Sequence, residues 1–267
     1  MRNNERLECL MRGCLLSIVT FLLGLGLPPA WALDHDNLDK NRPLRIEDAY
    51  PLAKGEFGLE GGARFVDRRQ GRTRFVFQPQ VLYGAFYNTQ LEIGGDLVTE
   101  PTSVEGAEKS GDVRVGVLYN LNTETLSLPA LAVKAEVEIP TGVRSKGVDG
   151  TLAGILTRSF GRWRTHLNAE YTVVGSARGG ERDGLYRLAL GVSYPLGYPM
   201  RFRETLIADV FTRQSDLSGG RNPTGIEVGL RHQFSSRIVL DGGLGTEFAG
   251  PSDRSAVLGT VGLSIGF

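Results

Sequence analysis

Residues 256–267 read AVLGTVGLSIGF, and the alternation in this stretch decides the fold of the chain. The apolar residues share one parity and the small or polar residues take the other, apart from Leu258. Successive side chains of a β-strand point to opposite faces, so this pattern predicts a strand with one apolar face. The next question is whether that face meets a protein core or lipid.

Similar alternating segments of about ten residues recur from residue 55 to the C-terminus, and turn residues end each of them. Clear examples are LAVKAEVEI (131–139) and RTHLNAEYTV (164–173). We count twelve segments, of which GTLAGILTRSF (150–160) and RFRETLIADVF (201–211) are the least regular. An even number of such strands is typical of single-chain bacterial outer-membrane barrels. The sequence therefore predicts an all-β, antiparallel, up-and-down transmembrane β-barrel.

The connections between these segments alternate in length. Short links such as FGRW (160–163) alternate with longer, charged links such as TEPTSVEGAEKSG (99–111) and PTGVRSKGVDG (140–150). The first hairpin, DRRQGRT (67–73), is short where a long loop is expected. Short periplasmic turns and longer outer loops are typical of outer-membrane barrels, whereas a soluble sandwich has no reason to sort its loops in this way.

Aromatic residues gather at the predicted strand ends. Tyr83, Phe86 and Trp163 are among those beside short turns, and a thinner set beside the long loops includes Phe65, Phe75, Tyr171, Tyr186, Phe211 and Phe248. Two aromatic girdles at opposite strand ends are expected at the two membrane interfaces. The apolar face of the last strand is thus expected to meet lipid. We expect Phe267 to close the barrel against the first strand and to serve as a signal for the outer-membrane assembly machinery.

The N-terminal residues predict export. Basic residues precede the apolar run LLSIVTFLLGLGL (15–27), and small residues follow it, which is typical of a signal peptide cleaved after Ala32. The run is too short to span a bilayer as a helix. The predicted organisation is a signal peptide over 1–32, a polar periplasmic leader over 33–54 that could also form a plug, and the barrel over 55–267. Both cysteines, Cys9 and Cys14, lie in the predicted signal peptide.

Charge alternation along the strands assigns the lumen. A charged side chain on the lipid face costs a few kcal/mol near the bilayer midplane, so the polar parity is expected to face inward. On RFRETLIADVF both parities carry charge, and we assign no inward face there. Twelve strands enclose a small interior, which favours a narrow, selective passage. The candidate substrate-contacting residues of the lumen are Glu92, Arg114, Lys134, Glu136, Glu138, Arg164, His166, Glu170, Arg187, Glu227 and Arg231.

An outer-membrane lipid enzyme would need an outward Ser–His pair on a strand. His232 has no serine two residues away, and His166 is predicted to face the lumen with Asn168 beside it. We therefore expect no enzyme activity. No cofactor or metal site is expected either, since His166 and Glu170 are about 13 Å apart along a strand. Without the signal peptide the net charge is about −1, which gives no field to attract nucleic acid.

Several segments carry a family resemblance: RIEDAYPLAKGEFGLEGG (45–62), FQPQVLYG (77–84) and, most specifically, KAEVEIPTG (134–142). Together with AEYTVVG (169–175) and GVSYPLG (191–197), they resemble outer-membrane transporters named after the meta pathway of phenol degradation. This resemblance covers residues 46–267. It implies an outer-membrane barrel that passes small hydrophobic or aromatic compounds, and it supplies no catalytic or binding residues.

The sequence thus predicts a bacterial outer-membrane channel for passive uptake of small organic solutes, with outer-membrane lipid and the assembly machinery as its other partners. Two alternatives stay open at this point, a lipid-modifying enzyme and a barrel without transport that serves a structural or surface-interaction role. An outward Ser–His pair would favour the enzyme. A lumen sealed by Arg–Glu pairs would favour the structural barrel.

Overall fold

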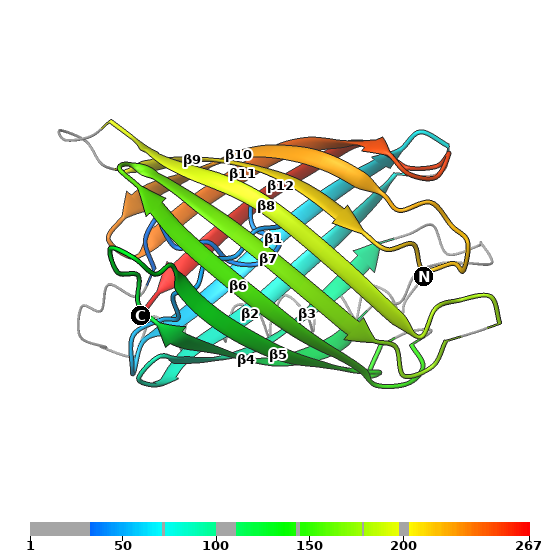
Figure 1. The fold of residues 1–267 in the computed structure, drawn as a ribbon, viewed down its shortest axis with the longest axis horizontal. Helices are drawn as coiled ribbons and strands as arrows, with labels where there is room; N and C mark the ends of the chain where they lie inside the picture. The colour runs from blue at the N-terminus through cyan, green and yellow to red at the C-terminus, as the bar shows by residue number, and fades with distance from the viewer. Residues whose placement is uncertain (1–32, 71–72, 100–110, 143–144, 178, 198–202) are drawn as a thin grey trace, which may run out of the picture.

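The computed structural model describes residues 33–70, 73–99, 111–142, 145–177, 179–197 and 203–267. Each strand pairs antiparallel with its neighbours in sequence, and the first pairs with the last, so the sheet closes into a twelve-stranded barrel with tilted strands (Figure 1). The predicted up-and-down barrel is confirmed. The strands are β1 (Phe57–Arg68), β2 (Arg74–Phe86), β3 (Thr89–Thr99), β4 (Asp112–Asn122), β5 (Ala130–Ile139), β6 (Asp149–Phe160), β7 (Trp163–Val173), β8 (Gly184–Leu196), β9 (Glu204–Arg213), β10 (Thr224–Ser235), β11 (Ile238–Ala249) and β12 (Ser255–Gly266).

The alternation in the sequence becomes an apolar outer face and a polar inner face. On β5, the side chains of Leu131, Val133 and Val137 are exposed on the outside, whereas Ala132 and Lys134 are buried inside. The same two-residue period runs along the other strands, and it leaves a belt of exposed Val, Leu, Ile and aromatic side chains around the barrel. A belt of this kind is suited to lipid. Within the described residues, no helix has the length and apolar character needed to cross a membrane.

The barrel closes between β1 and β12, which pair from Gly58 with Gly266 to Arg68 with Ser255. Beyond the strands, the Phe57 N–H donates to the Phe267 carbonyl at 3.1 Å, and the Phe267 N–H donates to the Phe57 carbonyl at 2.8 Å. Phe267 therefore extends the pairing that closes the barrel, as predicted. Its role in assembly stays a prediction.

Short and long connections lie at opposite ends of the barrel. The even-numbered strands β2 to β10 end, and the strands that follow them begin, at the end of the barrel that holds the C-terminus (Figure 1). The odd-numbered strands β1 to β11 end, and the strands that follow them begin, at the other end. We call these the short-turn end and the long-loop end. In outer-membrane barrels the corresponding ends face the periplasm and the exterior.

Aromatic rings pair on the outer surface at both ends. Phe57 stacks on Tyr83 with ring centroids 4.3 Å apart at the short-turn end, and Phe65 meets Phe75 at 5.4 Å near the long-loop end. These pairs fit the two predicted girdles. Phe211 was expected in the long-loop girdle, and this prediction is wrong. Its side chain is 1% exposed and points into the lumen.

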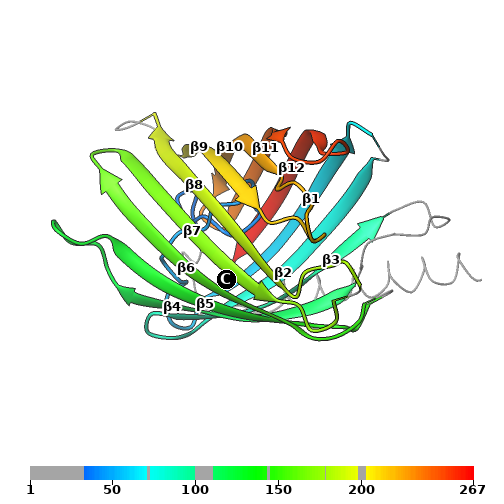
Figure 2. The same ribbon diagram turned by 45° about the vertical axis from the view of Figure 1, so that its right-hand side comes forward.

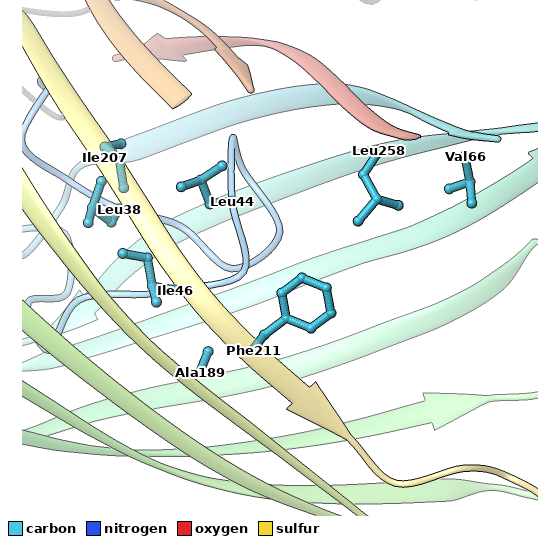
Figure 3. Close-up of a cluster of buried hydrophobic side chains, with 8 residues drawn as sticks. All are labelled: Leu38, Leu44, Ile46, Val66, Ala189, Ile207, Phe211 and Leu258. Carbon is cyan, nitrogen blue, oxygen red and sulfur yellow. The ribbon is translucent and has the colours of Figure 1, made fainter. Parts of the chain in front are cut away.

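The interior of the barrel is filled largely by residues 33–54, the predicted leader. Figure 2 shows this segment running between the strand walls. Its apolar side chains form three buried clusters with inward-facing strand residues. The largest, drawn in Figure 3, joins Leu38, Leu44 and Ile46 to Val66, Ala189, Ile207, Phe211 and Leu258. The predicted signal peptide, residues 1–32, lies outside the described residues.

Glycines on the inner face leave room for the leader. A Cβ atom at Gly84 would overlap the carbonyl group of Ala53, and one at Gly243 would lie 2.9 Å from Leu44 Cδ2. Any larger residue at these positions must displace leader atoms. The leader can therefore follow its observed path past β2 at Ala53 only because Gly84 has no side chain.

We predict that Gly84→Val displaces the leader and leaves the barrel closed, because the new side chain meets only leader atoms at close range. Trypsin should then cut after Lys40 and Arg45, which we expect to be protected in the wild-type protein because the leader lies inside the barrel, and mass spectrometry of the fragments measures this cleavage. Gly154→Val is the matched control, since a Cβ there has open space around it. Equal cleavage in the two variants would contradict the prediction.

Candidate functional site

The candidate site is the barrel lumen, where charged leader residues meet charged strand residues. The first cluster surrounds Lys134 on β5. Its ammonium group lies 2.8 Å from Glu47 of the leader and 2.7 Å from Glu92 on β3. Lys40 of the leader lies 2.8 Å from Glu136 and 3.1 Å from Glu170. These pairs join the leader to three strands.

A cavity of about 20 Å³ lies within this cluster, and Lys40, Gln80, Glu92, Arg114 and Lys134 are among the residues that line it. A space of this size holds about one water molecule among polar partners. This cavity is therefore too small to hold an organic solute beside the leader.

The second cluster surrounds Arg42 of the leader. Its Nη2 atom donates to Asp241 on β11 at 2.8 Å and to the Ser264 hydroxyl on β12 at 2.5 Å, and Nη1 lies 3.6 Å from Glu60 on β1. On the other side, Arg231 of β10 lies 3.4 Å from Asp39 of the leader. Arg231 is fully buried, so this ion pair lies away from water.

The third cluster lies at the leader residue Arg45. Its backbone N–H donates to Asp209 at 2.9 Å, and its guanidinium group lies 3.5 Å from Glu227 and 3.8 Å from the centre of the Phe211 ring. Glu227 also pairs with Arg64 of β1. The cationic group on the aromatic face is a favourable cation–π contact.

Polar strand side chains also satisfy the backbone of the leader, which joins no sheet. Asn168 accepts from the Glu47 N–H at 2.6 Å and donates to the Glu47 carbonyl at 2.9 Å. Asn120 donates to the Ala49 carbonyl at 2.6 Å, and Gln90 accepts from the Leu52 N–H at 2.8 Å. Buried backbone groups need such partners. These side chains thus allow an irregular segment to lie inside the barrel.

The eleven candidate residues predicted from the sequence all lie on the inner parity of their strands. Glu92, Lys134, His166, Glu227 and Arg231 are buried, and the others are partly buried. The structure brings most of them to the leader. Arg164 lies 3.6 Å from Asp36 of the leader, whereas Arg114 pairs with Asp96 at 2.8 Å on the strands themselves. Whether any of them contacts a substrate remains a proposal.

Charged inner-face side chains are partly exposed at both ends of the lumen, and Arg164, at the short-turn end of β7, is 38% exposed. The side chains of Arg114, Arg187 and Asp96 are 21%, 31% and 39% exposed, in contrast to the buried pairs deeper in the lumen. These residues lie nearer the long-loop ends of β4, β8 and β3. The lumen is thus partly solvated at both ends and filled by the leader between them.

Sequence analysis missed the leader residues and the strand residues Glu60, Arg64 and Asp209. The leader has no periodicity, so its partners could not be read from it. The inner face of β9 stayed unassigned because both parities mix charged and apolar residues. The structure shows that Thr205, Ile207, Asp209 and Phe211 face inward, and that Ile207 and Phe211 pack in the cluster that holds the leader.

A Ser–His contact does occur, but it faces inward. His166 Nε2 lies 3.1 Å from the Ser193 hydroxyl of β8, and Nδ1 lies 3.2 Å from Thr157. The sequence did not reveal this contact, because Ser193 and His166 lie on two different strands. Both side chains are buried, and a hydroxyl occupies the position where an orienting carboxylate would stand. In the described part of the chain, no group of three or more His, Cys, Asp or Glu residues is placed to hold a metal ion.

The model of one protein family matches residues 51–256 of this chain, and the description of that family is "Putative MetA-pathway of phenol degradation". The chain belongs to this family. The match covers all of β1–β11 and the start of β12, as the sequence resemblance predicted. A comparison with curated proteins finds no match.

Solved structures share the fold. An outer membrane channel from Pseudomonas putida F1 aligns over 82% of this chain and 98% of its own, with a TM-score of 0.59 and 16% identity. The NanC porin aligns over 78% of this chain and 98% of its own, with a TM-score of 0.56 and 13% identity. The KdgM porin covers 79% and 99%, with a TM-score of 0.53 and 10% identity. These structures are channels and porins, and the likeness shows that this chain shares their barrel fold.

We predict that Lys134→Met lowers the free energy of unfolding by about 3–5 kcal/mol, because it leaves the buried carboxylates of Glu47 and Glu92 without their cation. Urea unfolding of the refolded barrel measures this loss. Lys54→Met is the control, since Lys54 is exposed and its ammonium group lies 4.9 Å from the centre of the Tyr87 ring, a contact of about 1 kcal/mol or less. Equal unfolding midpoints for the two variants would contradict the prediction.

We predict that the binding of the leader inside the lumen depends on pH through the leader residue Asp48. Burial raises the pKa of its carboxyl group to about 7, although the Leu38 and Tyr50 N–H groups donate to it at 2.9 and 2.8 Å. Because the Asp48 carboxyl group has a higher pKa when the leader is inside the lumen, its protonation at low pH stabilises this position of the leader. The stabilisation is lost as the pH rises through about 7. The leader should therefore leave the lumen more often at about pH 8 than at about pH 5.

Thiol labelling of an Ala49→Cys variant at the two pH values measures this release, because Ala49 is fully buried when the leader is in place. Each rate is divided by that of an exposed Ser218→Cys variant, which corrects for the pH dependence of the thiol itself. Adding Asp48→Asn should reduce this dependence, and the neighbouring Glu47, whose carboxyl pKa is raised to about 8 by burial, should account for what remains. A ratio that is constant with pH would refute the assignment to Asp48.

Proposed function

We propose that this protein is an outer-membrane channel for passive uptake of small organic compounds, aromatic ones in particular, and that the leader closes it in the observed state. The observation that carries this proposal is that the barrel is wide enough to hold the leader, residues 33–54, inside its lumen. Inward-facing strand residues such as Lys134, Asn168 and Asp209 bond to the leader rather than filling the lumen by themselves. Without the leader, these polar groups would line a water-filled passage.

Family membership supports the solute class, since the family description concerns phenol degradation. The related structures support a channel, because they are channels and porins. The buried, inward Ser193–His166 contact offers no access for a lipid substrate, so we propose no enzyme activity.

A structural barrel without transport is the second candidate, and one observation favours it. Lys134, Arg42 and Arg231 each pair with an acid across the boundary between leader and wall, and the 33–54 segment occupies the lumen at these pairs. The two candidates differ in one respect. A channel requires the leader to move, whereas a structural barrel requires it to stay.

A reversible cross-link separates the two candidates. Ala49 and Thr157 are in contact, with the Ala49 N–H donating to the Thr157 hydroxyl at 3.1 Å, so a double Ala49→Cys/Thr157→Cys variant can tie the leader to β6. We expect liposomes with the reduced protein to take up neutral aromatic solutes such as 4-hydroxybenzamide faster than empty vesicles. Oxidation should abolish this uptake, and reduction should restore it.

The single Ala49→Cys variant is the control and should conduct under both conditions. A folded, reduced protein that passes no solute would remove the channel proposal and favour the structural barrel. Uptake that persists after cross-linking would show a passage that does not depend on the leader.

A further inference from the structure

A pocket of about 450 Å³ opens at the short-turn end of the barrel, where the leader runs out of the lumen toward β1. Leader residues 50–54 form one side of this pocket. The opposite side comes from Tyr87 and Asn88 in the β2–β3 turn and from Asn120 and Thr123 at the end of β4. We call it the leader-exit pocket. Small-molecule sites have volumes of about 300–1,000 Å³, so this pocket is large enough for an organic molecule, unlike the cavity of about 20 Å³ further in.

Two tyrosine rings in the pocket present uncovered apolar surface. Tyr87 is 79% exposed, and Tyr50 is partly exposed, although it also packs against the buried cluster that includes Ala49 and Leu118. The ammonium group of Lys54 lies 4.9 Å from the centre of the Tyr87 ring. A flat aromatic molecule in the pocket would bury exposed ring surface in stacked or edge-to-face contact, and aromatic faces also attract a cation.

The charged groups around the pocket have both signs: Lys54, Glu56, Asp48, Glu124 and Arg164. The Glu56 carboxylate accepts from the Ala53 N–H at 2.9 Å, so an acid adjoins the segment that carries Lys54. Burial raises the pKa of the Tyr50 hydroxyl group above its usual value, and this group therefore stays uncharged. With acids on both sides of Lys54, the pocket favours an uncharged ligand over an organic acid.

The leader and the strand wall are joined beside this pocket. The Asn120 side chain, on the strand side, donates to the Ala49 carbonyl of the leader at 2.6 Å. Ala49 directly precedes the leader side of the pocket and is fully buried. Because the leader supplies one side, the pocket is complete only while the leader lies inside the lumen.

We propose that the leader-exit pocket binds uncharged aromatic compounds and that a bound molecule holds the leader inside the lumen. Such a molecule would contact the leader at residues 50–54 and the strand side at Tyr87. A ligand shifts an equilibrium toward the state that it binds, and here this is the state in which the leader fills the lumen. Aromatic solute at the short-turn end would thus restrain passage. The inference rests on the proposed function, since it describes the regulation of that channel.

The first test is binding of 4-hydroxybenzamide to the refolded full-length protein, measured by saturation-transfer NMR. Its analogue 4-hydroxycyclohexanecarboxamide has the same polar groups and a saturated ring. We expect the aromatic compound to bind at least about threefold more tightly, the size of one aromatic pair contact, and Tyr87→Ala to remove this difference. Phe234→Ala is the control and should keep it, since Phe234 is an equally accessible aromatic residue on β10, away from the pocket.

The cross-linked Ala49→Cys/Thr157→Cys variant tests where the ligand binds. Oxidation ties the leader in place, and we expect 4-hydroxybenzamide to bind this form at least as tightly as the reduced form. Loss of binding on oxidation would overturn the inference, because the ligand would then occupy space that the leader has to vacate.

Thiol labelling of the Ala49→Cys variant at constant pH tests the effect on the leader. Since the ligand must dissociate before the leader moves, labelling should slow about twofold when the free ligand concentration equals its Kd and about tenfold at ten times that concentration. Adding Tyr87→Ala should weaken this slowing, and labelling of the Ser218→Cys variant should not respond to the ligand.

Three outcomes would contradict the proposal: equal affinity for the two compounds, affinities that Tyr87→Ala leaves unchanged, or labelling that the ligand leaves unchanged or accelerates. Binding and labelling are both measured without flux. A failure here therefore leaves the channel proposal standing, and a barrel that binds the aromatic compound but passes no solute would remove the channel proposal alone.

Discussion

The width of a twelve-stranded barrel is the constraint on which the rest of this structure depends. Twelve tilted strands enclose a lumen between those that side chains alone can fill and those that form open pores. Residues 33–54 occupy the remaining space, and the charges that meet there are buried. Burying charged groups is costly unless each finds a partner. The ion pairs of Lys134 with Glu47 and Glu92 satisfy this condition where the lumen is most tightly packed.

The same constraint explains features that are unusual for a barrel wall. Ile207 and Phe211 are apolar but face inward, because they pack against Leu38, Leu44 and Ile46 of the leader. Gly84 and Gly243 leave space for leader atoms. Asn168 and Asn120 supply the hydrogen bonds that an irregular backbone would otherwise lack. The inner wall is therefore complementary to this segment of chain.

Sequence alone determined the barrel, its strand number, the sorting of its loops and the inward orientation of residues such as Lys134, Glu136 and Arg231. These properties follow from the two-residue period of a strand and from the cost of placing charge in lipid, and both are local. The leader, the inner face of β9 and the contact of His166 with Ser193 required the tertiary structure. They depend on residues far apart in the chain, and no periodic pattern records which side chains a closed sheet brings together across its lumen.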